Sequence, residues 1–392
     1  MASLTGRDPA LLRRINSAVV LRELRSRVGG AAVTLTDLAQ ATGLSRPTLE
    51  GVVEGLGEAG LVAVAEEEAE ASGAARRGRP ARRFRFRAEA GHLLGVEIGT
   101  RRIAAVLSDL TGRSLGTVTR AVGEQDAAED RLEHALATVD DLLDRTGVER
   151  GALRAVGVCT PGIVEADGTV RLGTALPGWT GLPLGERLGR SFPCPVLVEN
   201  DANAAVLAEH WQGAARGVED VVMVLAGLSP GAGSLIGGRL HRGSGGAAGE
   251  IGALHLLGTE AYPEHLLSVT GEPLHPLDEA AVARVFAHAR EGDERAMLAV
   301  DRFVRRLVHD VAALVLALDP ELVVIGGWAS GLDGVLEPLR GELSRYCLRP
   351  PRVALSALGD AAVTRGALRL ALDHVEAELF ALEGPPGPAA TR

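Results

Sequence analysis

Apolar residues in the first part of the chain recur with the three-and-four spacing of helices. The segment 11–25 shows this spacing, and the segment 49–56 repeats it at positions i, i+3, i+4 and i+7. We predict Thr36 as the cap of a short helix and Ser45 as the cap of the next one. The apolar face of this second helix carries Leu49, Val52, Val53 and Leu56. Two short helices with one face left free predict a helix-turn-helix.

The apolar runs 60–64 and 84–86 then predict the two strands of a wing. The acidic tip between them, 66–70, is expected to be disordered. The segment 76–87 contains seven arginines and no acidic residue. Such a composition is typical of a surface that contacts phosphates, although a solvated basic linker would have it too. The first residues of the second helix of a helix-turn-helix reach base edges. We therefore expect base contacts from Ser45, Arg46, Thr48 and Glu50, and phosphate contacts from Arg76, Arg77, Arg79 and Arg82.

Charge is distributed unevenly along the chain. The first 88 residues carry a net charge of +4, whereas the whole chain of 392 residues carries −10. Two acidic residues of the basic part fit DNA binding poorly, because Glu50 and Glu54 lie one turn apart on the free face of the second helix. They would repel phosphates, unless Glu50 accepts a hydrogen bond from a cytosine amino group.

From residue 91 onward the pattern changes to short apolar runs at 93–98, 103–107 and 114–119, which predict an antiparallel meander. A helix is expected over 127–145, and a strand over 155–159. This alternation of strands and helices predicts an α/β fold.

The central stretch is rich in glycine. The apolar run 221–225 enters a Gly-Pro turn and the run 234–236 leaves it, which predicts a hairpin. A dinucleotide fingerprint or a Walker loop would need a helix at this place, and the chain contains no lysine for a Walker loop. Ten glycines between 227 and 252 indicate either tight turns or close approach of the backbone to a ligand.

Polar residues follow a second predicted strand, 195–198. Asn200 and Asp201 stand at its carboxyl end, where a helix to about residue 212 begins. Open α/β sheets bind ligands at such places. Glu250 adds a carboxylate within Ala248-Gly249-Glu250-Ile251-Gly252.

These motifs resemble the signature of the ROK family of repressors, open reading frames and sugar kinases, over roughly residues 91–373. The run Leu38-Ala39-Gln40-Ala41-Thr42-Gly43-Leu44-Ser45, followed by Gly78-Arg79-Pro80, is similar to the start of its winged-helix regulators. The resemblance implies an N-terminal winged helix-turn-helix and a two-lobed, actin-like ROK domain with a cleft near 200 and 227–255.

The resemblance also implies a sugar site. Asp201 corresponds to the family's catalytic base, and Asn200 and Glu250 correspond to sugar contacts. We assign the ligand site to Asn200, Asp201, Glu250 and His255. Ala175 and Ala253 stand where the family has asparagine and histidine, so the ligand is expected to be an atypical sugar, a sugar derivative or another compound. The family's zinc-binding cysteine cluster is absent from 256–273, and we expect neither a metal nor a cofactor.

Both loops that bind phosphates in the family's kinases are altered. The first, usually D-x-G-G-T-K, reads Glu97-Ile98-Gly99-Thr100-Arg101-Arg102, and the second contains Pro230. Phosphoryl transfer depends on positioning and charge stabilisation, so these changes disfavour a kinase. We therefore expect no enzyme activity, and Asp201 is catalytic only if the kinase alternative holds.

The remaining features limit where the protein acts. No apolar run of 18 residues and no signal-peptide pattern is found, and we expect a cytoplasmic protein without membrane contact. Three scattered cysteines exclude a disulfide framework. The predicted domains are 1–88, which binds DNA, 89–383, the ROK ligand-binding domain, and 384–392, a disordered tail. We expect the chain to be loose from Glu378 onward.

Together these features predict a transcriptional regulator, expected to be a repressor, that binds double-stranded operator DNA as a homodimer or higher oligomer and responds to a sugar effector. The alternatives are an ATP-dependent sugar kinase with an attached DNA-binding domain, and a DNA-binding protein whose ROK part serves only as a dimerisation scaffold.

Overall fold

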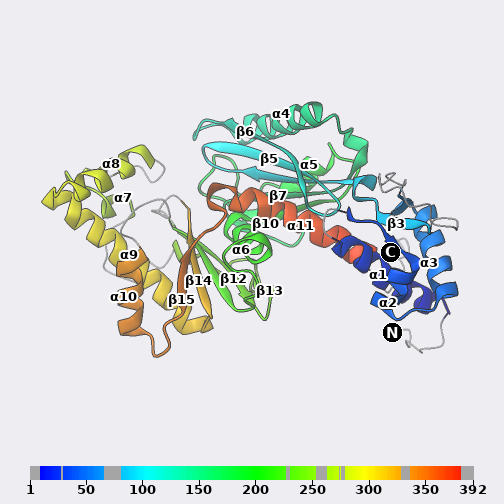
Figure 1. Cartoon of the computed structure of the whole chain (residues 1–392). Helices are drawn as coiled ribbons and strands as arrows, with labels where there is room; N and C mark the ends of the chain where they lie inside the picture. The colour runs from blue at the N-terminus through cyan, green and yellow to red at the C-terminus, as the bar shows by residue number, and fades with distance from the viewer. Residues whose placement is uncertain are drawn as a thin grey trace, which may run out of the picture.

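A computed structural model of the chain describes residues 9–27, 30–65, 81–226, 230–252, 263–272, 274, 279–327 and 336–380. These residues form a small N-terminal unit and two lobes, each built on a five-stranded sheet (Figure 1). The α/β class predicted from the sequence is therefore correct. No helix in the described ranges is long and apolar enough to cross a membrane.

The N-terminal unit combines helices with a three-stranded antiparallel sheet in the order β1-β3-β2. Its elements are α1 (Pro9–Ser26), β1 (Val33–Thr34), α2 (Leu35–Thr42), α3 (Arg46–Glu58), β2 (Val62–Val64) and β3 (Arg83–Phe86). The predicted apolar face of α3 is confirmed, because all four of its residues are buried. The predicted acidic tip at 66–70 lies outside the described residues.

Capping explains where α2 and α3 begin. Ser45 caps α3, as predicted. The prediction of Thr36 as the cap of α2 is wrong, because Thr34 takes this place in a capping box with Asp37. The Asp37 amide donates to Thr34 Oγ1 at 3.2 Å, and the Thr34 amide donates to Asp37 Oδ2 at 2.8 Å. A threonine and an acid three residues later each accept from the other's amide and so satisfy two amides, whereas the residue three positions after Thr36 is Ala39.

The first lobe has the strand order β10-β7-β4-β5-β6. Its strands are β4 (His92–Ile98), β5 (Arg102–Asp109), β6 (Ser114–Ala121), β7 (Leu153–Thr160) and β10 (Val196–Asn200), and its helices are α4 (Ala128–Thr146) and α5 (Leu184–Gly189). Strands β4, β5 and β6 form the predicted antiparallel meander, while β7 and β10 run parallel to β4. A separate hairpin joins β8 (Ile163–Val164) to β9 (Val170–Leu172).

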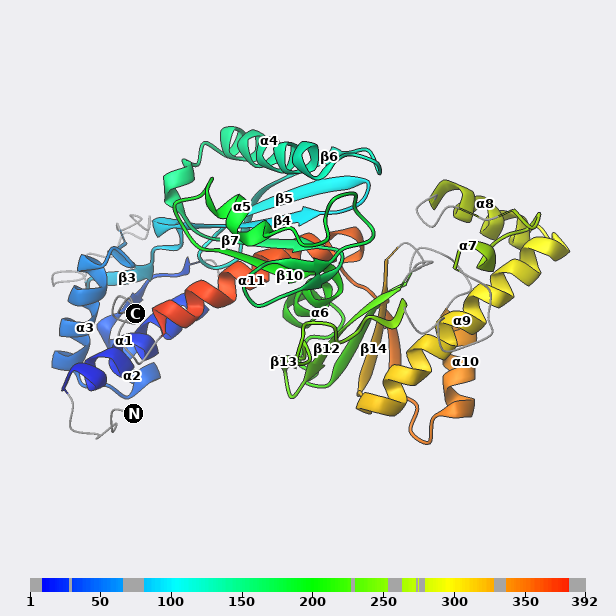
Figure 2. The same cartoon turned by 180° about the vertical axis from the view of Figure 1, so that it is seen from behind.

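The second lobe has the strand order β13-β12-β11-β14-β15. Its strands are β11 (Val221–Leu225), β12 (Gly231–Ile236), β13 (Arg239–Leu240), β14 (Leu322–Gly326) and β15 (Arg352–Leu355), and its helices are α7 (Pro263–Leu266), α8 (Glu279–Arg290), α9 (Glu294–Leu318) and α10 (Leu336–Tyr346). Strands β11 and β12 are antiparallel, which confirms the predicted hairpin. Figure 2 shows α8, α9 and α10 at the end of the molecule far from the N-terminal unit.

Two helices, α6 (Asp201–Gln212) and α11 (Ala362–Leu379), lie against each other between the two sheets (Figure 2). Glycine allows their close approach. A Cβ atom at Gly366 would lie 1.9 Å from the Ala204 carbonyl oxygen, and one at Gly157 would lie 1.8 Å from the Ala367 carbonyl oxygen. Larger residues at either place would push α11 away from α6 or from the first sheet.

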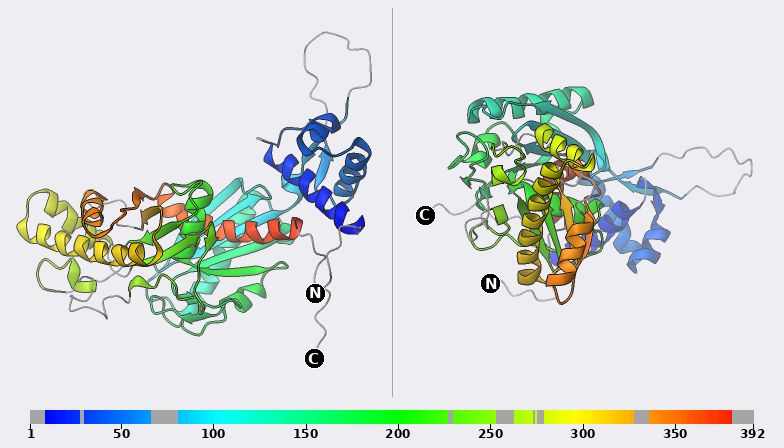
Figure 3. Two further views of the ribbon diagram at one scale, coloured as in Figure 1. Left: turned by 90° about the horizontal axis from the view of Figure 1, so that it is seen from below. Right: turned by 90° about the vertical axis from the view of Figure 1, so that its left-hand side faces the viewer.

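Helix α11 continues past the first lobe to the N-terminal unit (Figure 3). Leu372 and Val375 of α11 share one apolar cluster with Val20, Leu21 and Leu24 of α1. The loose tail expected from Glu378 is therefore wrong in its first residues, because Glu378 lies within α11 and Phe380 lies under the Arg22 guanidinium. The predicted tail 384–392 lies outside the described residues.

Candidate functional site

Asn200 and Asp201 lie where β10 ends and α6 begins, as expected from the sequence. The Asn200 side chain caps α6, since its Oδ1 accepts from the amides of Ala202 at 2.9 Å and Asn203 at 3.1 Å. Its Nδ2 donates to the Gly162 carbonyl oxygen at 3.0 Å, which ties α6 to the loop before β8. Capping fixes the side chain of Asn200 and the first turn that carries Asp201.

Glu199 connects this junction to the glycine-rich segment. Its side chain is only 4% exposed, and its Oε1 accepts from the Asn200 amide and from Asn203 Nδ2, each at 2.9 Å. Its Oε2 accepts from Arg242 Nε at 2.6 Å. A buried carboxylate with this many donors is charge-compensated, and it holds Arg242 at the start of the glycine-rich loop.

Glycines then bring that loop across to the first lobe. Gly246 has φ +72°, and a Cβ atom there would lie 2.4 Å from the Val164 carbonyl oxygen of β8. Gly249 has φ +88°, and a Cβ atom there would lie 1.8 Å from the Ala232 carbonyl oxygen of β12. The loop that carries Glu250 therefore touches both lobes, which requires glycine on steric grounds.

Carboxylates concentrate near Asp201. Desolvation, opposed by the hydrogen bond from the Ala202 amide and assisted by the negative charges of Glu97 and Glu250, raises the pKa of Asp201 to about 6. Desolvation also raises the pKa of Glu250. Asp201 therefore titrates close to neutral pH, in the range in which a carboxylate can either exchange a proton or accept hydrogen bonds from hydroxyl groups.

Burial and the same acidic surroundings raise the pKa of Cys159, at the end of β7, well above its usual value. The described residues contain no group of three or more His, Cys, Asp or Glu side chains placed to hold a metal ion.

In the first altered loop, the carboxylate of Glu97 is paired with the guanidinium of Arg102. Arg102 Nε donates to Glu97 Oε1 at 3.0 Å, and Arg102 Nη2 donates to both Glu97 oxygens and to the Asp360 carbonyl oxygen, the latter at 2.6 Å. Thr364 Oγ1 donates to Glu97 Oε2 at 2.5 Å. Glu97, the only acid of this loop, is thus already paired. In the kinases of the family, the acid at this position helps to place the metal and the nucleotide.

A buried arginine also fixes the backbone of the first loop. Arg131 of α4 is 0% exposed, and its Nη1 donates to the carbonyl oxygens of Gly99 at 2.6 Å and Thr100 at 3.2 Å. Its Nη2 donates to the Gly123 carbonyl oxygen at 2.7 Å. These bonds hold the turn between β4 and β5 in one conformation, and they could not be predicted locally because Arg131 lies in a different element.

A buried polar contact at the ends of β4 and β7 was not indicated by the sequence. Trp179 is fully buried, and its Nε1 donates to Thr160 Oγ1 at 2.9 Å. Thr160 Oγ1 in turn donates to the Ile98 carbonyl oxygen at 3.2 Å. The segment around Ala175 is therefore anchored through Trp179 to the ends of β4 and β7. His255 lies outside the described residues, as do Gly227–Ser229 of the second altered loop.

A cavity of about 560 Å³ opens beside these residues, between the turn that follows β8 and the loop 242–246. Glu165, Asp167, Glu199, Arg242 and Ser244 supply its polar lining. It adjoins the Glu199–Arg242 pair and contains none of Asn200, Asp201 and Glu250, so the predicted ligand residues do not line it.

The predicted base-contacting residues cluster at the start of α3. Ser45 Oγ lies 2.8 Å from Thr48 Oγ1, and Arg46 Nε donates to Glu50 Oε1 at 3.0 Å. The side chains of Arg46 and Glu50 are 73% and 55% exposed. Glu50 is thus paired with Arg46, a contact that lowers its repulsion toward phosphates and that the spacing i, i+4 could have predicted.

A groove of about 800 Å³ separates α3 from the sheet of the N-terminal unit, and its lining includes Arg46, Glu50, Glu54 and Arg82. Arg82, the described member of the predicted phosphate contacts, is exposed. Arg76, Arg77 and Arg79 lie outside the described residues.

Comparison with known proteins agrees with this architecture. The ROK family model matches residues 93–374. A xylose repressor from Caldicellulosiruptor bescii is 26% identical over 401 residues, which covers 93% of this chain and 97% of the repressor. A glucokinase from Thermotoga maritima is 29% identical over 284 residues and covers 65% of this chain and 88% of the kinase.

Among solved structures, a ROK family transcriptional regulator described as a homologue of the E. coli MLC protein covers 95% of this chain and 100% of its own, with a TM-score of 0.71 and 21% identity. At that identity the likeness shows the fold alone. A ROK hexokinase from Thermus thermophilus covers 73% of this chain and 99% of its own, with a TM-score of 0.60 and 29% identity.

Proposed function

The chain belongs to the ROK family, as its signature predicted, and from this premise we propose that it is a DNA-binding transcriptional repressor whose two-lobed domain senses a sugar or a sugar derivative. The observation that carries the proposal is the start of α3, where Ser45 and Arg46 are exposed and Thr48 is half-buried, on a helix whose opposite face is buried. Helices α2 and α3 with the sheet β1-β3-β2 then form a winged helix-turn-helix. The xylose repressor matches this part of the chain as well as the ROK part.

In this proposal the start of α3 enters the major groove. Arg46, held on one side by Glu50, presents its remaining nitrogens to a guanine edge, a pairing that discriminates between bases by roughly 1–3 kcal/mol. Arg82 and its neighbours contact phosphates, which makes the affinity depend steeply on salt. Paired α3 helices of a dimer would read two half-sites.

The sugar site in this proposal consists of Asn200, Asp201 and Glu250, with His255 as a further predicted contact. Ionised carboxylates accept hydrogen bonds from vicinal hydroxyl groups, which is how such a site recognises a sugar without ATP. The caps and glycine contacts that hold Asn200 and Glu250 in place support a built site rather than a mere scaffold for dimerisation.

The kinase alternative is disfavoured by the Arg102–Glu97 pair. A nucleotide with its metal would have to displace a guanidinium that donates to both Glu97 oxygens and to the Asp360 backbone. The glucokinase relative also leaves about a third of this chain uncovered, since it spans 65% of it.

The test begins with a duplex selected by the full chain from a random-sequence pool. D-xylose, D-glucose and N-acetylglucosamine are then titrated into the complex, and operator affinity is measured by fluorescence anisotropy. We expect one of these sugars to weaken binding by roughly 5- to 150-fold, and Asp201→Ala to retain the sugar-free affinity and lose the sugar's effect.

Two results would contradict the proposal. The first is that the pool yields no enriched duplex, which would show that the chain does not bind DNA sequence-specifically. The second is sugar-stimulated release of ADP from ATP that Asp201→Ala abolishes, which would establish the kinase alternative.

A further inference from the structure

Helix α11 starts beside the altered first loop, which joins β4 to β5. Thr364, in its first turn, donates to Glu97, and Arg102 donates to the backbone of Asp360 just before the helix. The N-terminal end of α11 is thereby fixed to the carboxylate that also raises the pKa of Asp201.

The next turn of α11 is packed directly on α6, the helix that begins with Asp201. At Gly366 there is no room for a methyl group between α11 and the backbone of Ala204. On its other side α11 rests on β7, where Gly157 leaves equally little room at Ala367. A displacement of the first turns of α6 would therefore also displace α11, because closely packed interiors transmit strain.

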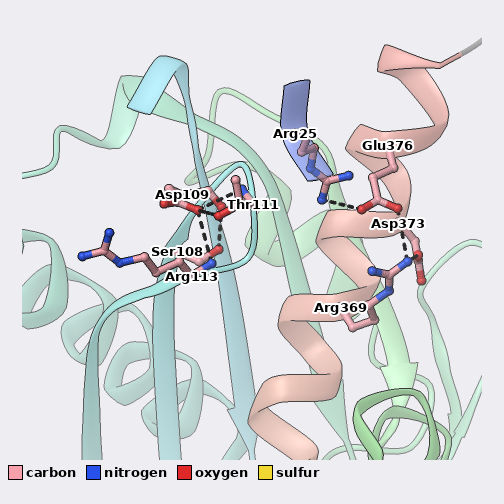
Figure 4. Close-up of polar contacts among 8 residues, drawn as sticks. All are labelled: Arg25, Ser108, Asp109, Thr111, Arg113, Arg369, Asp373 and Glu376. Carbon is pink, nitrogen blue, oxygen red and sulfur yellow. Dashed lines mark hydrogen bonds and ion pairs between the residues drawn. The ribbon is translucent and has the colours of Figure 1, made fainter. Parts of the chain in front are cut away.

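The far end of α11 meets α1 of the N-terminal unit through charged groups that are mostly buried. Arg25 Nη2 lies 2.6 Å from Glu376 Oε1, and the two side chains are 17% and 23% exposed. Arg369 reaches the other oxygen of Glu376 at 3.2 Å and also pairs with Asp373 (Figure 4). The Arg22 guanidinium lies 4.8 Å from the ring centroid of Phe380.

The other end of α6 enters the same junction. Arg369 lies over the Trp211 ring, at 5.5 Å from its centroid, and Trp211 closes α6 on the side away from Asp201. The turn after β5 also packs against the Trp211 ring, where a Cβ atom at Gly112 would lie 2.5 Å from Trp211 Cζ2. Asp109 fixes this turn by accepting from the Thr111 amide at 2.8 Å (Figure 4).

We propose that α11 transmits occupancy of the Asp201 site to the DNA-binding unit, and that the Arg25–Glu376 pair is the joint through which α11 positions α1. The inference rests on the proposed function, because it supplies the regulation of that same site. At about 1.5 Å per residue, the 18 residues of α11 span roughly 27 Å from the first loop to α1. Shifts of packed helices by about 1–2 Å are a common way for such signals to reach an interface.

The experiment compares Arg25→Ala, Glu376→Gln and the double variant with the wild type. Glu376→Gln keeps the shape of the side chain and removes its charge. Arg27→Ala is the matched control, because Arg27, directly after α1, pairs with Glu23 of α1 and not with α11. Each full-length protein is titrated onto a duplex selected by the wild type, with and without D-xylose or D-glucose, and sugar binding is measured separately by calorimetry.

We expect Arg25→Ala and Glu376→Gln to bind the sugar and the sugar-free duplex within about threefold of the wild type. The sugar-induced change in operator affinity should fall from roughly 5- to 150-fold to less than about threefold. The double variant should show no further loss, because either single substitution already removes the Arg25–Glu376 pair. Arg27→Ala should respond as the wild type does.

A full response in Arg25→Ala or Glu376→Gln, or an equal loss in Arg27→Ala, would overturn the inference alone. If the wild type binds the duplex and calorimetry detects neither sugar, the proposed sensing function fails, and the inference fails with it. The two failures are therefore separated by the calorimetry of the wild type.

Discussion

Asp201 shows how a single buried carboxyl group can work against folding. Its carboxyl group is desolvated and faces the charges of Glu97 and Glu250, so its pKa rises to about 6 in the folded protein. In the unfolded chain the pKa lies near the ordinary value of 3.8. The folded state therefore holds the proton more tightly than the unfolded state does.

This difference sets the sign of a pH dependence. The contribution of Asp201 to stability is fully present below pH 3.8 and is lost as the pH rises through about 6. We expect Asp201→Asn, which is always neutral, to unfold at a higher temperature than the wild type at pH 8. Its advantage should shrink between pH 7 and pH 5. Thermal unfolding followed by circular dichroism at these pH values measures the effect, and an advantage that grows toward pH 5 would contradict it.

Residues whose partners are close in sequence were predictable, and those with distant partners were not. The position of Asn200 and Asp201 follows from a strand that ends where a helix begins, which apolar spacing reveals. The role of Arg102 does not follow in this way, because its contact with the Asp360 backbone joins residues 258 positions apart. The sequence therefore showed that the first loop was altered, while the structure shows what replaces the loop's usual partner.

Among the elements, α6 and α11 form the contact that joins the two lobes, because α11 packs on the first sheet and α6 packs on the second. Their approach depends on Gly366, where a methyl group would lie 1.9 Å from the Ala204 carbonyl oxygen. Backbone atoms cannot rotate away as a side chain can, so the two helices themselves would have to separate.

We expect Gly366→Ala to lower the free energy of unfolding by about 1–3 kcal/mol, despite the better helix propensity of alanine. Gly341→Ala in α10 is the matched control, since a methyl group there meets no atom within 4 Å. It should leave stability unchanged or raise it by up to about 1 kcal/mol. Thermal unfolding of the two variants beside the wild type tests the contrast, and equal midpoints for both would show that the α6–α11 contact is not tight.

Most elements could be predicted because each has a regular apolar period of its own, as in the meander of β4, β5 and β6 and in α3. The errors fell at helix ends. Thr34 caps α2 instead of Thr36, because Asp37 stands three residues after Thr34 and completes a capping box. Helix α11 extends past Glu378, because α1 packs against its last turns. A helix end that is set by contact with a distant element leaves no local signal.

At the scale of the whole molecule, the two ends of the chain complete one core. Val375, which is 1% exposed, belongs to the same apolar cluster as Leu21 and Leu24 of α1. The predicted boundary between residues 88 and 89 thus separates segments of sequence, whereas the packing continues across it into the first lobe.

A shortened chain tests this arrangement. Ending the chain after Asp373 removes Val375, Glu376 and Phe380, and each buried apolar side chain lost costs about 1.5–3 kcal/mol. We expect α1 to become sensitive to limited proteolysis, while a chain that ends after Phe380 resists as the full chain does. Equal resistance of the two shortened chains would mean that the N-terminal unit is stable without α11.

The shared core also bears on how such a protein can change in evolution. An exchange of the first 88 residues between two related proteins would pair the α1 of one parent with the α11 of the other. Leu24 and Arg25 would then contact side chains that differ from their original partners. Hybrids should therefore be tolerated when the segments 9–90 and 362–380 come from the same parent. In genetic terms, the two termini of this chain are expected to be inherited as one unit.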